Sequence, residues 1–100
     1  MSTEKTADIR NRMTELLRSE MPVLRARARV SQGEIAEKIG ISRQTYSSIE
    51  TGKREMSWTT FLALIAYFQN NESTRHMLDG IDGLSEGMEL IMEHNYDENR

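Results

Sequence analysis

Apolar residues recur at helical spacing through the middle of the chain, and each recurrence follows a capping signal. Ser31, Ser42 and Ser57 can each accept a hydrogen bond from a backbone N–H group of a new helix. Each serine also has an apolar residue directly before it and another four residues after it, which is the spacing of a hydrophobic staple. The predicted helices span about residues 32–39, 43–51 and 58–69.

The first two of these helices are joined by only Gly40 and Ile41. Gly40 can take the left-handed backbone conformation that ends a helix, and Gly52 follows the second helix in the same way. So short a connection makes the helices meet at a steep angle, with the small Ala36 allowing close approach. This is the helix-turn-helix arrangement, in which the second helix is held out to enter a DNA major groove.

The flanking segments are predicted to be helical as well. Pro22 suits the first turn of a helix and disfavours helical geometry at the residue before it, so we expect a separate N-terminal helix within residues 1–21. Ser73 is placed to cap a short helix that ends near Gly80, and a last apolar stripe predicts a helix that ends near Asn95. Because nothing reads as a strand, the predicted fold class is all-α.

Composition narrows the possible functions. A length of 100 residues fits one domain, and the absence of cysteine removes disulfides, thiolate metal sites and thiol nucleophiles. The first 20 residues lack a signal-peptide apolar run, and no later run is long enough to span a bilayer. We therefore expect a cytoplasmic protein without membrane contact.

Charge is distributed unevenly along the chain. The net charge of −3 argues against a polyanionic partner. However, residues 21–60 carry seven cationic and four anionic side chains, whereas residues 61–100 carry two cationic and eight anionic side chains. The middle of the chain can therefore face DNA while the C-terminal part is repelled by it.

The stretch "LRARARVSQGEIAEKIGISRQTYSSIETGKREMSWTTFLALIAYF" resembles the phage-repressor-like helix-turn-helix family of lambda repressor and Cro, also called the XRE family. The motifs that carry the resemblance are "SQGEIAEKIGIS" and "IETGKR". The resemblance implies a five-helix domain over residues 22–80, bacterial or phage origin, and sequence-specific transcriptional regulation, with repression as the expected role. The N-terminal helix of residues 1–21 and a C-terminal helical extension with an acidic tail, residues 81–100, would be additions to that domain.

The helix at 43–51 carries the residues expected to read DNA. Tyr46 and Ile49 should point inward, which leaves the polar side chains outward. Arg43 can bridge the two acceptors of guanine, and Gln44 can pair with both major-groove groups of adenine. The predicted base-contacting residues are Arg43, Gln44, Ser47 and Ser48, and the resemblance implies the same for Arg43, Gln44 and Ser48. The alternative is a merely solvated helix face.

Other residues are predicted to hold the DNA backbone or the fold. Gln32 begins its helix, where free backbone N–H groups attract phosphate, and the resemblance makes it a phosphate contact. The predicted phosphate contacts are Gln32, Ser42, Lys53 and Arg54, which position the duplex without reading its sequence. The resemblance also implies a structural brace in which Arg25 pairs with Glu50.

The helix at 58–69 predicts a homodimer. Its residues 61–68 are all apolar, so packing on the helix-turn-helix can cover only one side. The candidate dimer residues are Leu64, Tyr67, Leu84, Met88 and Ile91, where the last three would pack on the first two either within one chain or across a twofold axis. The alternative contact is the N-terminal stripe of Ile9, Met13, Leu16 and Leu17. Two recognition helices could then address half-sites roughly 34 Å apart.

Catalytic and metal-binding patterns are missing from the sequence. His76 and His94 have no neighbours at ligand spacing, and neither a phosphate-binding glycine loop nor a nucleophile with its base is recognisable. We therefore expect no metal, no cofactor and no enzyme activity. The predicted function is a transcriptional regulator that binds double-stranded DNA. The alternative is a protein-interaction module, antitoxin-like or anti-repressor, whose acidic C-terminal part engages a partner protein.

Overall fold

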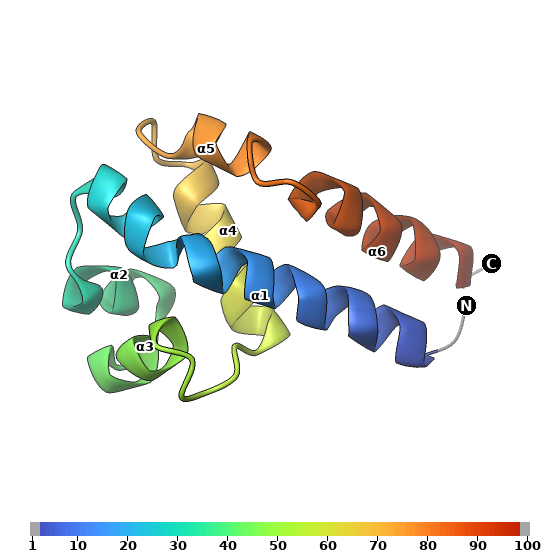
Figure 1. The fold of residues 1–100 in the computed structure, drawn as a ribbon, viewed down its shortest axis with the longest axis horizontal. Coiled ribbons are helices and arrows are strands. Elements are labelled where there is room, and N and C mark those ends of the chain that lie inside the picture. Colours follow the sequence, from blue (N-terminus) through green and yellow to red (C-terminus); the bar gives the residue numbers. More distant parts are fainter. Residues whose placement is uncertain (1–2, 99–100) are drawn as a thin grey trace.

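Over the residues that the structure describes, the protein folds as six helices around one core. The structure is a computed structural model that describes residues 3–98, and side chains over residues 5–93. The helices are α1 (Thr3–Ala28), α2 (Gln32–Ile39), α3 (Arg43–Glu50), α4 (Trp58–Gln69), α5 (Arg75–Asp79) and α6 (Leu84–Glu98). No strand occurs among these described residues, and the predicted all-α class is confirmed (Figure 1).

The predicted break at Pro22 is wrong, because α1 runs without interruption from Thr3 to Ala28 with Pro22 inside it. An interior proline costs a helix about 3 kcal/mol. Here the apolar stripe continues past the proline, since Met21 and Leu24 are both fully buried in the core. Packing of that continuous stripe offsets the local cost, so residues 3–21 are the first part of α1 rather than a separate helix.

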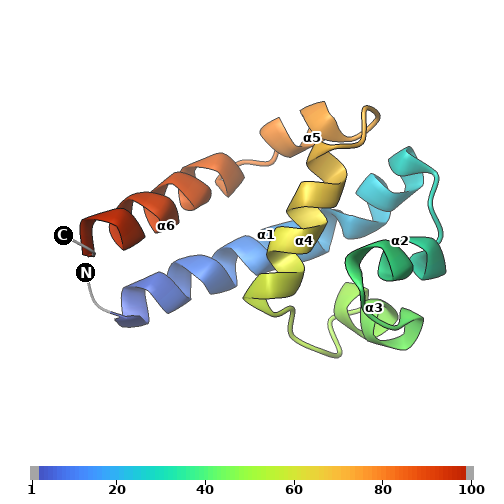
Figure 2. The same ribbon diagram turned by 180° about the vertical axis from the view of Figure 1, so that it is seen from behind.

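The centre of the core is α4. Phe61, Leu64 and Phe68 are each 0% exposed, and α4 packs against α1, α2 and α5. Figure 2 shows α4 crossing α1, with α2 and α3 on one side of the crossing and α6 on the other. The short α2–α3 pair is thereby held against the C-terminal half of α1, away from α6.

The C-terminal extension is α6, which runs back along the N-terminal half of α1 (Figures 1 and 2). The two helices approach closely where Gly87 faces Met13, because a Cβ atom at Gly87 would lie 2.7 Å from the Met13 sulfur. The helix extends beyond the predicted end at Asn95 as far as Glu98. Residues 99 and 100 of the predicted extension lie outside the described part.

Three of the predicted dimer residues are buried within their own chain, which is one of the two arrangements that the sequence left open. Leu64 is 0%, Leu84 4% and Ile91 1% exposed, since α6 folds back onto α1 and α4 lies at the centre. Tyr67 and Met88 are partly buried against the same core. In the alternative N-terminal stripe, Met13 and Leu17 are also fully buried, and Ile9 is packed against the core.

The predicted cap at Ser73 is also wrong. Thr74 is the residue that precedes α5, and its side chain does not cap the helix. Instead the buried Thr74 hydroxyl donates a hydrogen bond to the carbonyl oxygen of Phe68 at 2.7 Å. That bond ties the start of α5 to the end of α4.

Candidate nucleic-acid interface

The turn between α2 and α3 forms as the sequence predicts. Ser31 caps α2 in a reciprocal capping box with Glu34, and Ser42 caps α3 by accepting the backbone N–H of Thr45 at 3.0 Å. Gly40 ends α2 in the left-handed conformation, with φ of 82°. Only glycine takes this conformation without strain, so the tight turn depends on it.

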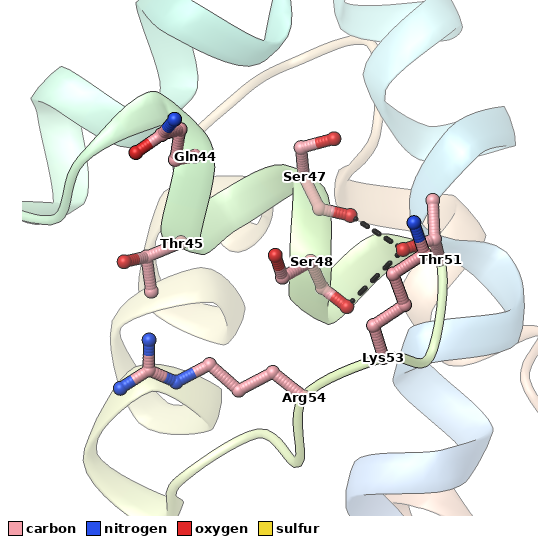
Figure 3. Close-up of a pocket in the computed structure, with 7 residues that line it drawn as sticks. All are labelled: Gln44, Thr45, Ser47, Ser48, Thr51, Lys53 and Arg54. Carbon is pink, nitrogen blue, oxygen red and sulfur yellow. Dashed lines mark hydrogen bonds between the residues drawn. The ribbon is translucent and has the colours of Figure 1, made fainter.

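The helix α3 turns one face to the core and the other to solvent, as predicted. Tyr46 is 0% and Ile49 2% exposed, so these two side chains anchor the helix. On its opposite side, together with the loop that follows, α3 forms an open hollow of about 410 Å³. The hollow is lined by Gln44, Thr45, Ser47, Ser48, Thr51, Lys53 and Arg54 (Figure 3).

The hollow brings together three of the predicted base-contacting residues and two of the predicted phosphate contacts. The backbone N–H groups of Lys53 and Arg54 both donate to the carbonyl oxygen of Ser48, at 2.9 and 3.1 Å, which ties the loop to the end of α3. Figure 3 shows Arg54 extending toward the side of α3 that carries Thr45, whereas Lys53 stays near Thr51. Two cations therefore border the polar face of α3.

The predicted reader Arg43 lies apart, beside the start of α2. A second hollow, of about 240 Å³, is lined by Gln32, Arg43, Gln44 and Ser47. The Arg43 Cδ atom lies 3.7 Å from the position that a Cβ atom would take on Gly33, so the stem of Arg43 passes close over the first turn of α2. Gln44 and Ser47 line both hollows and connect them.

Sequence reasoning missed two residues of the first hollow, Thr45 and Thr51. Thr51 donates to the carbonyl oxygens of Ser47 and Ser48, at 3.0 and 3.3 Å (Figure 3). The helical spacing of Gln44, Ser48 and Thr51 was a signal that could have identified Thr51. Thr45 gives a weaker signal, because it lies between the inward and outward faces of α3.

Ser42, a predicted phosphate contact, already uses its hydroxyl within the chain. The hydroxyl accepts the N–H of Thr45 and donates to the hydroxyl of Thr45 at 2.9 Å. Ser42 does not line either hollow. The structure therefore gives it a capping role, and its phosphate contact stays a prediction.

The predicted brace between Arg25 and Glu50 is confirmed. Arg25 donates from Nε to Oε2 of Glu50 at 3.1 Å and from Nη2 to Oε1 at 3.0 Å. The Glu50 side chain is only 8% exposed and the Arg25 side chain 24%. A two-pronged contact of this kind fixes α1 against the end of α3.

Gln32 also binds this carboxylate, which the sequence did not predict. Its Nε2 atom donates to Oε1 of Glu50 at 3.3 Å. Burial by itself raises the pKa of Glu50, but the hydrogen bonds from Arg25 and Gln32, with the neighbouring Tyr46 hydroxyl, outweigh burial and lower that pKa. Because its pKa is lowered, Glu50 is an ionised acceptor at neutral pH. The pKa of Tyr46 is raised, mainly by burial and further by the neighbouring Glu50.

The described part of the chain shows neither a metal-binding cluster nor a membrane-spanning helix. Over residues whose placement is described, no group of three or more His, Cys, Asp or Glu side chains is arranged to hold a metal ion. The side chain of His94 lies outside the described residues. Within residues 3–98, no helix has the length and apolar character needed to cross a bilayer.

A family model described as a helix-turn-helix domain matches residues 16–77. No curated protein and no solved structure matches the chain. The matched residues run from the middle of α1 into α5 and include both hollows and the Arg25–Glu50 brace. The chain therefore belongs to the helix-turn-helix domain family.

Proposed function

We propose that this protein is a transcriptional regulator of the phage-repressor-like, or XRE, class, which binds double-stranded DNA at specific sequences and acts as a repressor. The observation that carries the proposal is the outward face of α3, where Gln44, Ser47 and Ser48 line a polar hollow bordered by Lys53 and Arg54. A helix placed in the major groove reads bases through side chains of this donor and acceptor type.

The proposed division of labour follows from side-chain chemistry. Arg43 and Gln44 make two-pronged contacts with base edges, and the serine hydroxyls contribute weaker contacts. Lys53 and Arg54 bind phosphates on the same duplex, and the free N–H groups at the start of α2 bind another next to Gln32. Thr45 joins the base-reading group, because it lines the same hollow.

The position of the acidic residues supports this orientation on DNA. Residues 61–100 carry eight acidic side chains, and α5 and α6 lie across α1 from α2 and α3 (Figure 1). With α3 in the groove, α5 and α6 are held on the side of the protein away from the phosphates. Arg43, Lys53 and Arg54 are then the cations that approach the duplex.

We further propose that the protein binds DNA as a homodimer. Leu64, Leu84 and Ile91 are buried, but a hollow of about 290 Å³ opens between α4, α5 and α6, with the apolar Ile65 and Met88 in its lining beside polar and acidic side chains. Leu62, 37% exposed, lies one turn before Ile65, and Met92, 50% exposed, lies one turn after Met88. A second copy docked over this surface would cover these apolar side chains and pair two recognition helices.

The function is tested by selecting bound sequences from a random duplex library and then measuring affinity for selected and random duplexes. A preferred sequence should bind the wild-type chain more than about a thousandfold tighter than random DNA. Gln44→Ala should lose much of that preference. Asn11→Ala, a change at an exposed amide side chain on α1 outside the proposed DNA and dimer surfaces, is the matched control and should keep it. Equal affinity of the wild-type chain for all duplexes would refute the proposal.

The dimer is tested by measuring mass in solution. Leu62→Glu should shift the protein toward monomer, while Val23→Glu, a change at an exposed apolar residue on α1, should leave the dimer intact. A wild-type chain that stays monomeric at high micromolar concentration would refute the dimer.

One observation favours the second candidate, a non-enzymatic protein-interaction module. A hollow of about 410 Å³ between α1 and α5 has Leu16, Met77 and Ile81 in its lining, together with the acidic Glu20 and Asp82. Such a surface suits an apolar segment with basic residues on a partner protein. Transcriptional regulation and binding of a partner protein can coexist in one cytoplasmic protein. The selection from a random duplex library separates the two candidates, because a pure interaction module would yield no preferred sequence.

A further inference from the structure

The carboxylate of Glu50 joins three helices. It accepts two hydrogen bonds from Arg25 of α1, and its Oε1 atom accepts a further one from Gln32, the first residue of α2. Glu50 itself is the last residue of α3 and is 8% exposed. The ion pair explains the contact with Arg25, but it does not explain why Gln32 is held by the same group.

The chemistry of the two groups decides how the Gln32 amide is turned. An ionised carboxylate only accepts hydrogen bonds, whereas an amide has two N–H donors at one end and a carbonyl acceptor at the other. Gln32 must therefore turn its NH₂ group toward Glu50. Because the amide is planar, its carbonyl oxygen is then directed away from Glu50.

The other side of Gln32 borders the base-reading residues. Gln32 lines the 240 Å³ hollow together with Arg43, Gln44 and Ser47. Arg43 and Gln44 both carry side-chain N–H donors, for which a fixed carbonyl oxygen is a partner. An amide turned the other way would present its own N–H groups to them and would favour different side-chain conformations.

We propose that Glu50 is a positioning residue for DNA recognition, which acts through Gln32 to present a carbonyl oxygen to Arg43 and Gln44 and so sets the base preference of α3. This inference rests on the proposed DNA-reading function. Loss of this positioning should change the preference for one DNA sequence over another. It should not change the affinity for random DNA, because that affinity comes from phosphate contacts, which carry no sequence information.

The test compares base preference in the full-length chain. Glu50→Gln keeps the shape of the side chain but offers both a donor and an acceptor, so the Gln32 amide is free to turn either way. The ratio of affinities for the preferred duplex and a random duplex should fall about fivefold or more, which is the lower limit for one good base contact. Affinity for the random duplex should stay unchanged. When Gln32→Ala is already present, Glu50→Gln should cause no further loss of the ratio.

Arg25→Gln is the matched control. It removes the cation of the brace but leaves the Glu50 carboxylate to hold Gln32, so it should lower the melting temperature without changing the preference ratio. An equal fall of the ratio in Arg25→Gln and Glu50→Gln would overturn the inference, since the effect would then act through the fold. Independent, additive losses for Gln32→Ala and Glu50→Gln would overturn it as well.

A measurement on the unbound wild-type chain covers the case in which Glu50→Gln does not fold. One side-chain amide proton of Gln32 should exchange with solvent more slowly in NMR spectra than those of the exposed Gln44. Equal exchange rates for the two residues would overturn the inference. A wild-type chain without sequence preference would refute the proposed function, whereas a preference that Glu50→Gln leaves intact refutes only the inference.

Discussion

Removal of either partner of the Arg25–Glu50 brace should destabilise the protein, and by different amounts. Arg25→Met leaves a carboxylate that is 8% exposed and still accepts a hydrogen bond from Gln32. Loss of the partner of a buried charge costs about 3 to 5 kcal/mol, and the contact with Gln32 brings the expected cost to about 3 kcal/mol. Glu50→Ala leaves Arg25, which is 24% exposed and still contacts the carbonyl oxygen of Val30, so about 1 to 2 kcal/mol is expected.

The free energy of unfolding is to be measured by urea denaturation followed by circular dichroism. A cost of 3 kcal/mol corresponds to a fall in melting temperature of about 12 °C or more for a domain of this size. Arg27→Met, at an exposed position in the same helix, is the control and should change stability by less than about 0.5 kcal/mol. The double variant Arg25→Met/Glu50→Ala should cost no more than Arg25→Met alone, because it leaves no unpaired buried charge.

The pH dependence gives an independent check of the same brace. The pKa of Glu50 is lowered in the folded protein, so its contribution to stability is present above the pKa of the unfolded carboxyl group and is lost as the pH falls through the folded pKa. Arg25→Met should therefore lower the free energy of unfolding by less in acid than at neutral pH.

The reasoning about the brace would be refuted if Glu50→Ala lowered the free energy of unfolding by more than Arg25→Met does. It would also be refuted if the two losses were purely additive in the double variant.

Three further predictions concern DNA contacts and the packing of α6. Gln44→Ala should cost about 1 to 3 kcal/mol on the preferred duplex and much less on random DNA, as measured by fluorescence anisotropy; equal losses would make Gln44 a phosphate contact. Lys53→Ala should weaken binding to all duplexes and reduce the slope of log affinity against log salt by about one unit, and an unchanged slope would remove Lys53 from the interface. Gly87→Leu should destabilise the protein by about 1 to 3 kcal/mol in urea denaturation, because Met13 already occupies the space beside Gly87; exposed Glu86→Leu is its control, and equal effects would contradict the close packing.

Local signals predicted the helix-turn-helix well. Ser31, Ser42 and Ser57 cap the three helices as expected, and Gly40 takes the left-handed conformation, because a cap or a tight turn involves only residues within a few positions of one another. The outward orientation of α3 followed from the apolar Tyr46 and its neighbours in the same way.

Features that depend on distant contacts could not be predicted from the same signals. The helix α1 continues through Pro22 because the core holds the stripe on both sides of it. The burial of Leu84 and Ile91 depends on α6 folding back onto α1, and an apolar stripe does not indicate which surface will cover it. The Gln32–Glu50 hydrogen bond joins residues 18 positions apart and depends on how α2 and α3 cross.

The central claim is that the polar face of α3 and the loop after it bind DNA. The most direct measurement is an NMR titration of the full-length chain with its preferred duplex, in which backbone amide shifts are followed residue by residue. The account predicts the largest shifts within residues 43–54 and at the start of α2, with small shifts in α5 and α6. Largest shifts in α5 and α6, or no shifts at saturating duplex, would contradict it.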